Sequence, residues 1–257
     1  MSNRLIRSSL CAVAIFALLL FSWTRARSTE FKPVSHELVE ARLRRYPGND
    51  KQRQQTLKQM FAEAGCDGEN LFEQLLKGSQ SANVICVLPG SSDKVIVVGA
   101  HFDHVSNGDG VVDNWSGASL LPSLYESVKI APRKHSYIFI GFAAEEQGEL
   151  GSHFYARQMT KEQVTATEAM VNMDTLGLAP TETWASHSDK RLNAALFYVG
   201  KQMNSPISGV NVEQVGSSDS EQFAERKIPS ITIHSLTQET WENFPPFDSM
   251  TTTSHTA

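Results

Sequence analysis

The chain has 257 residues, of which 40% are hydrophobic and 20% are charged. This composition excludes a disordered or fibrous protein and suits one globular domain. The formal net charge of -5 excludes the strongly basic surface that is typical of nucleic-acid binding, so we expect no nucleic-acid partner.

An apolar stretch near the N-terminus predicts export. Arg4 and Arg7 precede residues 10–23, which have the length of the apolar part of a secretory signal and fall short of the ~20 residues that cross a bilayer comfortably. No clear small-residue cleavage site follows, so residues 1–27 are either a removed signal peptide or an N-terminal membrane anchor. We favour the signal peptide and expect a periplasmic or extracellular protein, with any membrane attachment made only through this segment.

Two cysteines follow the export segment. Cys66 and Cys86 lack the Cys-x-x-Cys spacing of a redox motif, and an oxidising compartment permits a disulfide bond between them. The alternative is a pair of buried thiols. We expect a structural disulfide.

After the export segment, the sequence shows two helical patterns followed by two strand patterns. Apolar residues at helical spacing predict helices over residues 37–45 and 51–64, which we expect to cover the edge of a sheet. Strands are predicted over residues 83–88 and 94–100, and the Pro- and Gly-containing turn between them favours a hairpin.

The later elements alternate between helix and strand. The predicted order is a helix over 116–130, a strand over 135–144, a helix over 151–159, a strand over 169–173 and a last strand over 228–234. Alternation of this kind is typical of α/β proteins, so we predict an α/β sandwich.

Histidine and acidic residues stand at the ends of three predicted strands. His101 follows one strand, Glu145 and Glu146 follow the next, and Asp174 follows a third. Because the carboxyl ends of neighbouring parallel strands share one edge of a sheet, we expect these side chains to converge in one crevice. Clustered carboxylates repel one another unless a cation lies between them, and carboxylate and imidazole ligands suit zinc. The sequence therefore predicts a metalloenzyme.

Each of these residues also has an ordinary interpretation when it is taken alone. Asp113 lies in a Gly- and Asn-containing loop where Asp commonly forms turns, and Glu145 with Glu146 would suit a helix N-terminus. Their joint occurrence near strand ends favours the metal site.

Four segments resemble successive motifs of the M28 zinc peptidases, a family that also includes glutaminyl cyclases. They are GAHFDHV at 99–105, DNWSGAS at 113–119, AAEEQGELGSHFY at 143–155 and VNMDTLG at 171–177. The resemblance implies that residues 30–257 form a three-layer α/β/α sandwich with a mixed, mostly parallel sheet and two zinc ions at its carboxyl edge. It also implies an aminopeptidase that removes N-terminal residues from peptide or protein substrates.

The resemblance also assigns the zinc ligands. It gives His101 and Asp174 to one zinc ion, Glu146 to the second, and Asp113 to both as a bridge.

Two further carboxylates receive catalytic roles. Glu145 would be the general base, because a carboxylate that lies beside a cation without binding it is free to accept a proton from water. Asp103 would orient the ring of His101, as carboxylates do for histidine ligands.

The C-terminal part departs from the family pattern. The family takes a histidine for the second zinc from a late HTxxDT segment, but residues 244–249 fall there and Phe244 occupies the position of the histidine. Phenylalanine has no lone pair for a metal, so we expect a weaker second site. His255 is a candidate replacement, and we interpret His234 as a strand residue. The domain is expected to be shortened at its C-terminus.

A Ser- and Asp-containing segment resembles the SDHxxF loop that lines the substrate pocket in the family. Asp219 and Ser220 are the candidate substrate-binding residues. Helix capping is the alternative role for this segment, and we favour it for Ser218.

The sequence favours a zinc aminopeptidase over two alternatives. A glutaminyl cyclase-like acyltransferase would depend on Asp113, Glu146 and the late histidine that is in doubt. A catalytically impaired homologue that acts as a binding domain is the second alternative. The oligomeric state and the preferred N-terminal residue of the substrate are not determined by the sequence.

Overall fold

The computed structural model describes residues 31–210 and 217–236. These residues belong to the second of the two units into which the chain divides, Phe31–Ala257. The predicted export segment, residues 1–27, lies outside the described residues. Within the described ranges, no helix is both long enough and apolar enough to cross a membrane.

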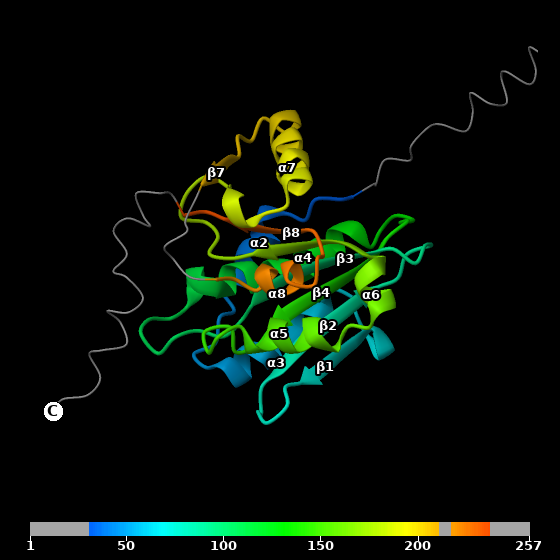
Figure 1. Cartoon of the computed structure of the whole chain (residues 1–257). Coiled ribbons are helices and arrows are strands. Elements are labelled where there is room, and N and C mark those ends of the chain that lie inside the picture. Colours follow the sequence, from blue (N-terminus) through cyan, green and yellow to red (C-terminus); the bar gives the residue numbers. More distant parts are fainter. Residues whose placement is uncertain (1–30, 211–216, 237–257) are drawn as a thin grey trace, which may run out of the picture. The chain divides into compact units, whose positions relative to one another are not determined.

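Helices and strands alternate through most of the described chain (Figure 1). The helices are α2 His36–Leu43, α3 Asp50–Glu63, α4 Ser116–Val128, α5 Leu150–Gln158, α6 Lys161–Ala166, α7 Lys190–Gln202 and α8 Ser220–Ala224. The strands are β1 Leu71–Leu75, β2 Ala82–Leu88, β3 Val95–His101, β4 Ser136–Phe142, β5 Thr167–Met173, β6 Glu182–Trp184, β7 Ser208–Val210 and β8 Ser230–His234.

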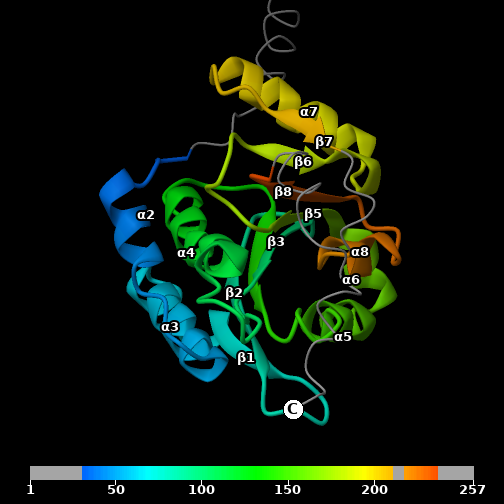
Figure 2. The same cartoon turned by 90° about the vertical axis from the view of Figure 1, so that its left-hand side faces the viewer.

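The described strands form one eight-stranded mixed sheet in the order β1-β2-β4-β3-β5-β8-β6-β7. The pairs β3–β4, β3–β5, β5–β8 and β6–β7 are parallel, and the other neighbours are antiparallel. Figure 2 shows α2, α3 and α4 on one side of the sheet and α5, α6 and α8 on the other. The predicted three-layer α/β/α sandwich with a mixed, mostly parallel sheet is therefore confirmed.

Each face of the sheet has its own hydrophobic core, because successive strand residues point to opposite sides. On the side of α3 and α4, the core contains Val84, Cys86, Val98 and Phe139 together with the helix residues Leu57, Met60 and Phe61. On the other side it contains Ile85, Val97, Ile140 and Phe142, packed with Met170 and Phe223. Burial on both faces explains why the central strands are apolar along most of their length.

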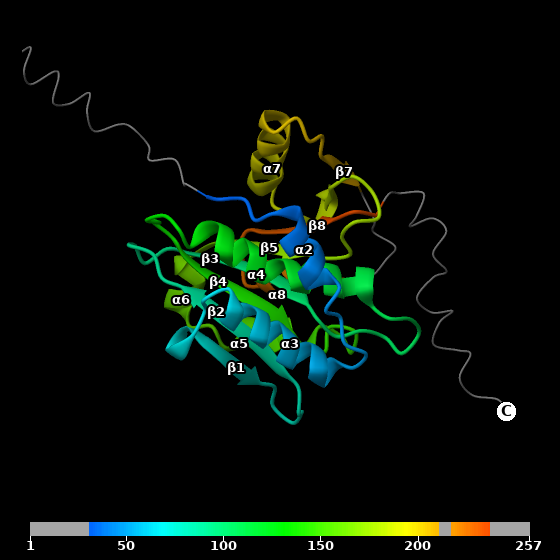
Figure 3. The same cartoon turned by 180° about the vertical axis from the view of Figure 1, so that it is seen from behind.

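Helix α3 lies across the β1 and β2 end of the sheet (Figure 3). It begins after Asn49, whose side chain accepts a hydrogen bond from the Gln52 backbone N–H. Leu57 packs closely on β4 at Gly141, where an added Cβ would clash with Leu57 Cδ2. Helix α2 packs mainly against α4, so the expectation that both helices cover the edge of the sheet is correct only for α3.

The predicted hairpin between the strands over residues 83–88 and 94–100 is wrong. Strand β4 lies between β2 and β3 in the sheet, antiparallel to the first and parallel to the second. The connecting turn bonds to the segment before β4, because the N–H groups of Ser91 and Ser92 donate to the carbonyls of Arg133 and Lys134. The last four residues of β4 are buried, which agrees with a central position that covers both of its faces.

A disulfide bond joins Cys66, just after α3, to Cys86 in β2, as predicted. Both cysteines are buried in the core between α3 and the sheet. The bond therefore ties the N-terminal helical part of the chain to the sheet.

Replacing both Cys66 and Cys86 with serine should lower the free energy of unfolding by about 3 kcal/mol, since the bond closes a loop with a sequence separation of 20. Urea unfolding with and without dithiothreitol measures this. The reductant should destabilise the wild type and leave the double variant unchanged. An equal response of the two proteins would contradict the disulfide.

Candidate metal centre

The candidate site lies where β4, β3 and β5 end at the same edge of the sheet. His101 is the last residue of the middle strand, β3. Glu145 and Glu146 lie in the turn that follows β4, and Asp174 follows β5 directly. The adjacent order of these parallel strands therefore brings together side chains that are far apart in the sequence.

Carboxylates surround the buried imidazole of His101. Its Nε2 atom lies 3.2 Å from Asp113 Oδ1, 3.7 Å from Asp174 Oδ1 and 3.8 Å from Glu145 Oε2. Two sets of ligand atoms each lie within 4.8 Å of one another: His101, Asp113 and Glu146 form one set, and His101, Glu145 and Asp174 form the other. The predicted convergence of these side chains is present, while their roles as ligands stay a prediction.

The carboxylate of Glu145 lies within the cluster of candidate ligands. Because it shares a set with His101 and Asp174, its carboxylate is placed either to bind a metal or to accept a proton beside one. Its position in a turn, with its side chain 13% exposed, differs from the solvated helix N-terminus that was the alternative interpretation.

Asp103 fixes the turn that carries the two glutamates. Its carboxylate is buried and accepts hydrogen bonds from the backbone N–H groups of Glu145 at 3.0 Å and Glu146 at 3.2 Å. It lies 3.6 Å from His101 Nδ1, beyond an ordinary hydrogen bond. Burial would raise the pKa of Asp103, but His101 and these N–H groups lower it. The main observed role of Asp103 is therefore to hold the turn with Glu145 and Glu146 in position.

Asn114 ties the segment that carries Asp113 to the end of β5. The Asn114 side chain is buried, donates to the Met173 carbonyl at 2.9 Å and accepts from the Thr175 N–H at 3.2 Å. Its two partners flank Asp174. One amide therefore positions two candidate ligands, a role that the sequence did not reveal.

Ser218 holds the carboxylate of Asp174. Its hydroxyl donates to Asp174 Oδ2 at 3.0 Å and accepts from Asn172 Nδ2 at 2.7 Å. The predicted capping role of Ser218 is wrong, because helix α8 has no side-chain hydrogen bond at its N-cap, Asp219. Thr175 also donates to Asp174, through its hydroxyl at 3.1 Å.

The two candidate substrate-binding residues are both buried. The hydroxyl of Ser220 is paired with Thr232 at 2.7 Å, so a substrate-binding role for Ser220 has no exposed group to act through. Burial raises the pKa of Asp219 to about 8. Contact between Asp219 and substrate stays a prediction.

The electrostatics of the cluster favour a bound cation. Burial alone would lower the pKa of His101, but the nearby carboxylates, led by Glu145, raise it well above its usual value. Burial and neighbouring carboxylates raise the pKa of Glu145 to about 10 and that of Glu146 to about 7, although His101 opposes both shifts. The carboxylates thus lack compensating positive charge, and a nitrogen and oxygen donor set of this kind fits zinc.

Two histidines, His234 and His255, are candidates for the late ligand. His255 lies outside the described residues, as does Phe244. His234 is buried on β8, where its Nδ1 accepts from the Leu236 N–H at 3.1 Å. Among the described residues, neither set of candidate ligands includes His234, and its interpretation as a strand residue is confirmed.

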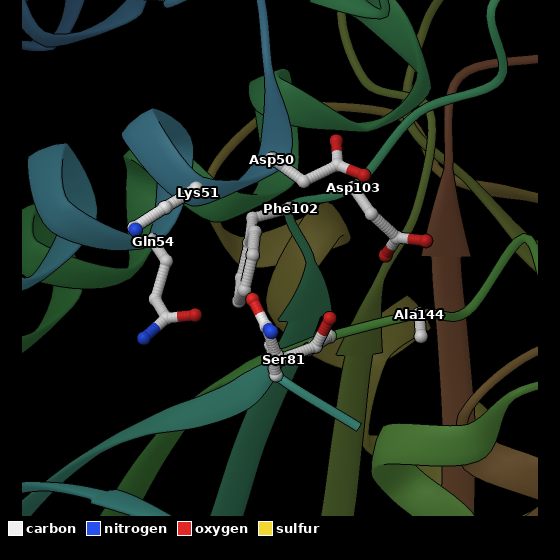
Figure 4. Close-up of a pocket in the computed structure, with 9 residues that line it drawn as sticks. Asp50, Lys51, Gln54, Ser81, Phe102, Asp103 and Ala144 are labelled. Atoms are coloured by element: carbon white, nitrogen blue, oxygen red, sulfur yellow. The ribbon is translucent and has the colours of Figure 1, made fainter. Parts of the chain in front are cut away.

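A pocket adjoins the site at Asp103 (Figure 4). Its wall includes polar residues from the first turns of α3 and from the turn between β1 and β2, and Phe102 lines it as well. The pocket residues are Asp50, Lys51, Gln54, Gln80, Ser81, Phe102, Asp103, Ala143 and Ala144. Helix α3 therefore contributes to the surroundings of the site.

The chain shares its three-layer sandwich with solved structures of zinc exopeptidases. The profile of peptidase family M28 matches residues 83–257, which is more than half of the chain. The chain belongs to peptidase family M28.

Known proteins with similar sequences or structures agree with this assignment. Aminopeptidase YwaD of Bacillus subtilis is 28% identical over 186 residues, covering 65% of this chain and 40% of the relative. The structure of a zinc aminopeptidase from Bacillus subtilis matches with a TM-score of 0.58 at 26% identity, over 64% of this chain and 42% of that one. A glutaminyl cyclase from an Acidobacteriales bacterium has a TM-score of 0.64 at 16% identity, over 84% and 87%, and shares the fold.

The chain spans less than half the length of these two Bacillus relatives. Family membership and fold are therefore established for the part that matches.

Replacing Ser218 with alanine should weaken zinc binding about tenfold, because the carboxylate of Asp174 loses a hydrogen bond that orients it. Competition with a chelating dye measures the zinc dissociation constant. Ser220→Ala is the matched control, since it removes a buried hydroxyl from the same segment that bonds to Thr232. Equal zinc affinities for the two variants would contradict the role of Ser218.

Proposed function

We propose that this protein is a zinc-dependent aminopeptidase that hydrolyses N-terminal residues of peptide or protein substrates. The observation that carries the proposal is the cluster of Asp113, Glu145, Glu146 and Asp174 around His101 at the carboxyl edge of the sheet. The aminopeptidases that are similar in sequence support the choice of reaction. The fold alone would not distinguish this reaction from others.

We infer that the ligands divide between two zinc ions, as the resemblance to the family implies. His101 and Asp174 would hold one ion, Glu146 the other, and Asp113, whose side chain is 58% exposed, would be shared. Bound zinc supplies positive charge that lowers the pKa of water and polarises the carbonyl of the scissile peptide bond. The hydrogen bonds from Ser218 and Thr175 would keep the Asp174 carboxylate oriented for this purpose.

Glu145 is the residue we assign as general base. In peptide hydrolysis, water adds to the carbonyl carbon, its proton passes to a base, and the same proton is later delivered to the leaving amine nitrogen. The positive charge of bound zinc would keep the neighbouring Glu145 carboxylate ionised, so that it can accept this proton. Its backbone N–H is fixed by Asp103, which keeps the carboxylate beside His101.

We also infer that the protein is exported. Residues 1–27 have the pattern of a signal peptide or an anchor, and the disulfide between Cys66 and Cys86 suits an oxidising compartment. The chain has an acidic net charge, so nucleic acid is not a proposed partner.

Replacing Glu145 with glutamine should reduce hydrolysis of aminoacyl nitroanilides by roughly 10²–10⁴-fold while zinc stays bound, because the water loses its proton acceptor. Steady-state kinetics and zinc content measured on the same preparation test this. Gln147→Glu, in the same turn, is a control that adds a carboxylate and should not abolish activity.

The result also distinguishes the alternative functions. Loss of zinc from Glu145→Gln would make Glu145 a ligand and contradict its role as base. Cyclisation of N-terminal glutamine without peptide cleavage would identify a glutaminyl cyclase-like enzyme. A wild-type protein that binds no zinc and cleaves no substrate would be an impaired homologue.

Replacing Glu146 with glutamine should lower the zinc stoichiometry from two ions to one, because the second ion loses a charged ligand that lies near Asp113. Calorimetric titration of the metal-free protein with zinc measures the stoichiometry. A wild type that binds a single ion would show that the second site is not formed.

A further inference from the structure

Arg53 of α3 is a fully buried cation that contacts the region of the candidate site. Its side chain is 0% exposed. Within the described residues, its hydrogen bonds all go to backbone carbonyl oxygens. The guanidinium carbon also lies 5.7 Å from the centre of the buried Trp115 ring. Burying a charged group costs free energy unless its N–H groups are hydrogen-bonded. The four hydrogen bonds of Arg53 offset this cost and fix the position of its guanidinium group.

Three of the four carbonyls that Arg53 contacts lie at the two ends of one loop. Its Nη1 atom donates to the Phe102 carbonyl at 3.2 Å and to the Gly110 carbonyl at 2.9 Å. Its Nη2 atom donates to the Asp109 carbonyl, next to Gly110. A single guanidinium therefore joins the beginning and the end of the loop over residues 102–110.

The two ends of this loop adjoin candidate zinc ligands. Phe102 lies between His101 and Asp103, and Gly110 lies three residues before Asp113. His101 Nε2 and Asp113 Oδ1 are 3.2 Å apart, although the loop between them is long. Joining the loop ends limits how far these two side chains can separate.

The fourth hydrogen bond of Arg53 joins it to the N-terminal part of the chain. Its Nε atom donates at 3.1 Å to the carbonyl of Pro47, in the turn between α2 and α3. The planar guanidinium directs its donors in a fixed fork, and an ammonium group cannot reproduce this arrangement. The N-terminal helices are thereby connected to the loop through one side chain.

We propose that Arg53 is a positioning residue for the metal centre: by joining the ends of the 102–110 loop, it holds His101 and Asp113 at the separation that zinc binding requires. The inference rests on the proposed function, because it assigns zinc to these residues. Arg53 lies before residue 83, where the match to the M28 profile begins. The helices that precede the match thus take part in the site as well as in the packing.

The chain offers a matched control in Arg42 of α2. Arg42 is also buried, at 5% exposed, and lies on an N-terminal helix. It donates to Ser123 Oγ and Glu126 Oε2, both at 2.7 Å and both on α4. Its loss removes buried arginine contacts without touching the 102–110 loop.

The test compares Arg53→Lys, Arg53→Met and Arg42→Met with the wild type. Zinc dissociation constants are measured by competition with a chelating dye, and thermal unfolding is followed by circular dichroism. Amide hydrogen exchange of residues 103–109 is measured on the metal-free proteins. We expect both Arg53 variants to bind zinc about 10–100-fold more weakly and to exchange faster in this loop. Arg42→Met should unfold at a lower temperature but keep its zinc affinity within roughly twofold.

Other outcomes would overturn the inference. Arg53 would be a merely structural residue if Arg53→Lys bound zinc as tightly as the wild type and kept its slow exchange. It would also be merely structural if Arg42→Met lost zinc affinity to the same extent. Should Arg53→Met not fold, Arg53→Lys decides alone, since it retains the buried charge. A wild type that binds no zinc would overturn the proposed function, and this inference with it, whatever the variants do.

Discussion

Mutual repulsion among carboxylates is the constraint on which this structure depends. Four acidic side chains lie around one buried imidazole, and the pKa values of Glu145 and Glu146 are raised because burial and neighbouring charges disfavour their ionised forms. Such a cluster destabilises a fold unless it binds positive charge. Its presence in a well-packed sandwich therefore indicates a site selected for a cation and not for stability.

Much of the molecule serves to keep this cluster in place. Asp103 fixes the turn with the two glutamates, Asn114 joins the Asp113 segment to the end of β5, and Ser218 holds the Asp174 carboxylate. Each of these contacts joins segments that are distant in sequence. Arg53 extends the same arrangement to the N-terminal helices. Precise positioning of a metal site thus depends on buried polar side chains in several layers of the fold.

The elements with strong periodic patterns could be predicted from the sequence. The apolar strands β3, β4 and β5 and the helices α3, α4 and α5 lie within a few residues of their predicted bounds. The prediction of a hairpin between β2 and β3 is wrong, because the apolar pattern of a strand does not specify which strand lies beside it in the sheet. The short strands β6 and β7 have three residues each and were not predicted, since their formation depends on the strands beside them.

The sequence by itself determined the chemistry: which histidine and carboxylates are available, and that they follow the ends of apolar strands. It also indicated the family through its four motifs. The tertiary structure decided which residues support that chemistry, because the roles of Arg53, Asn114 and Ser218 come from contacts across 44 to 61 residues of chain. Such contacts form between side chains that are brought together by packing, and no local pattern encodes them.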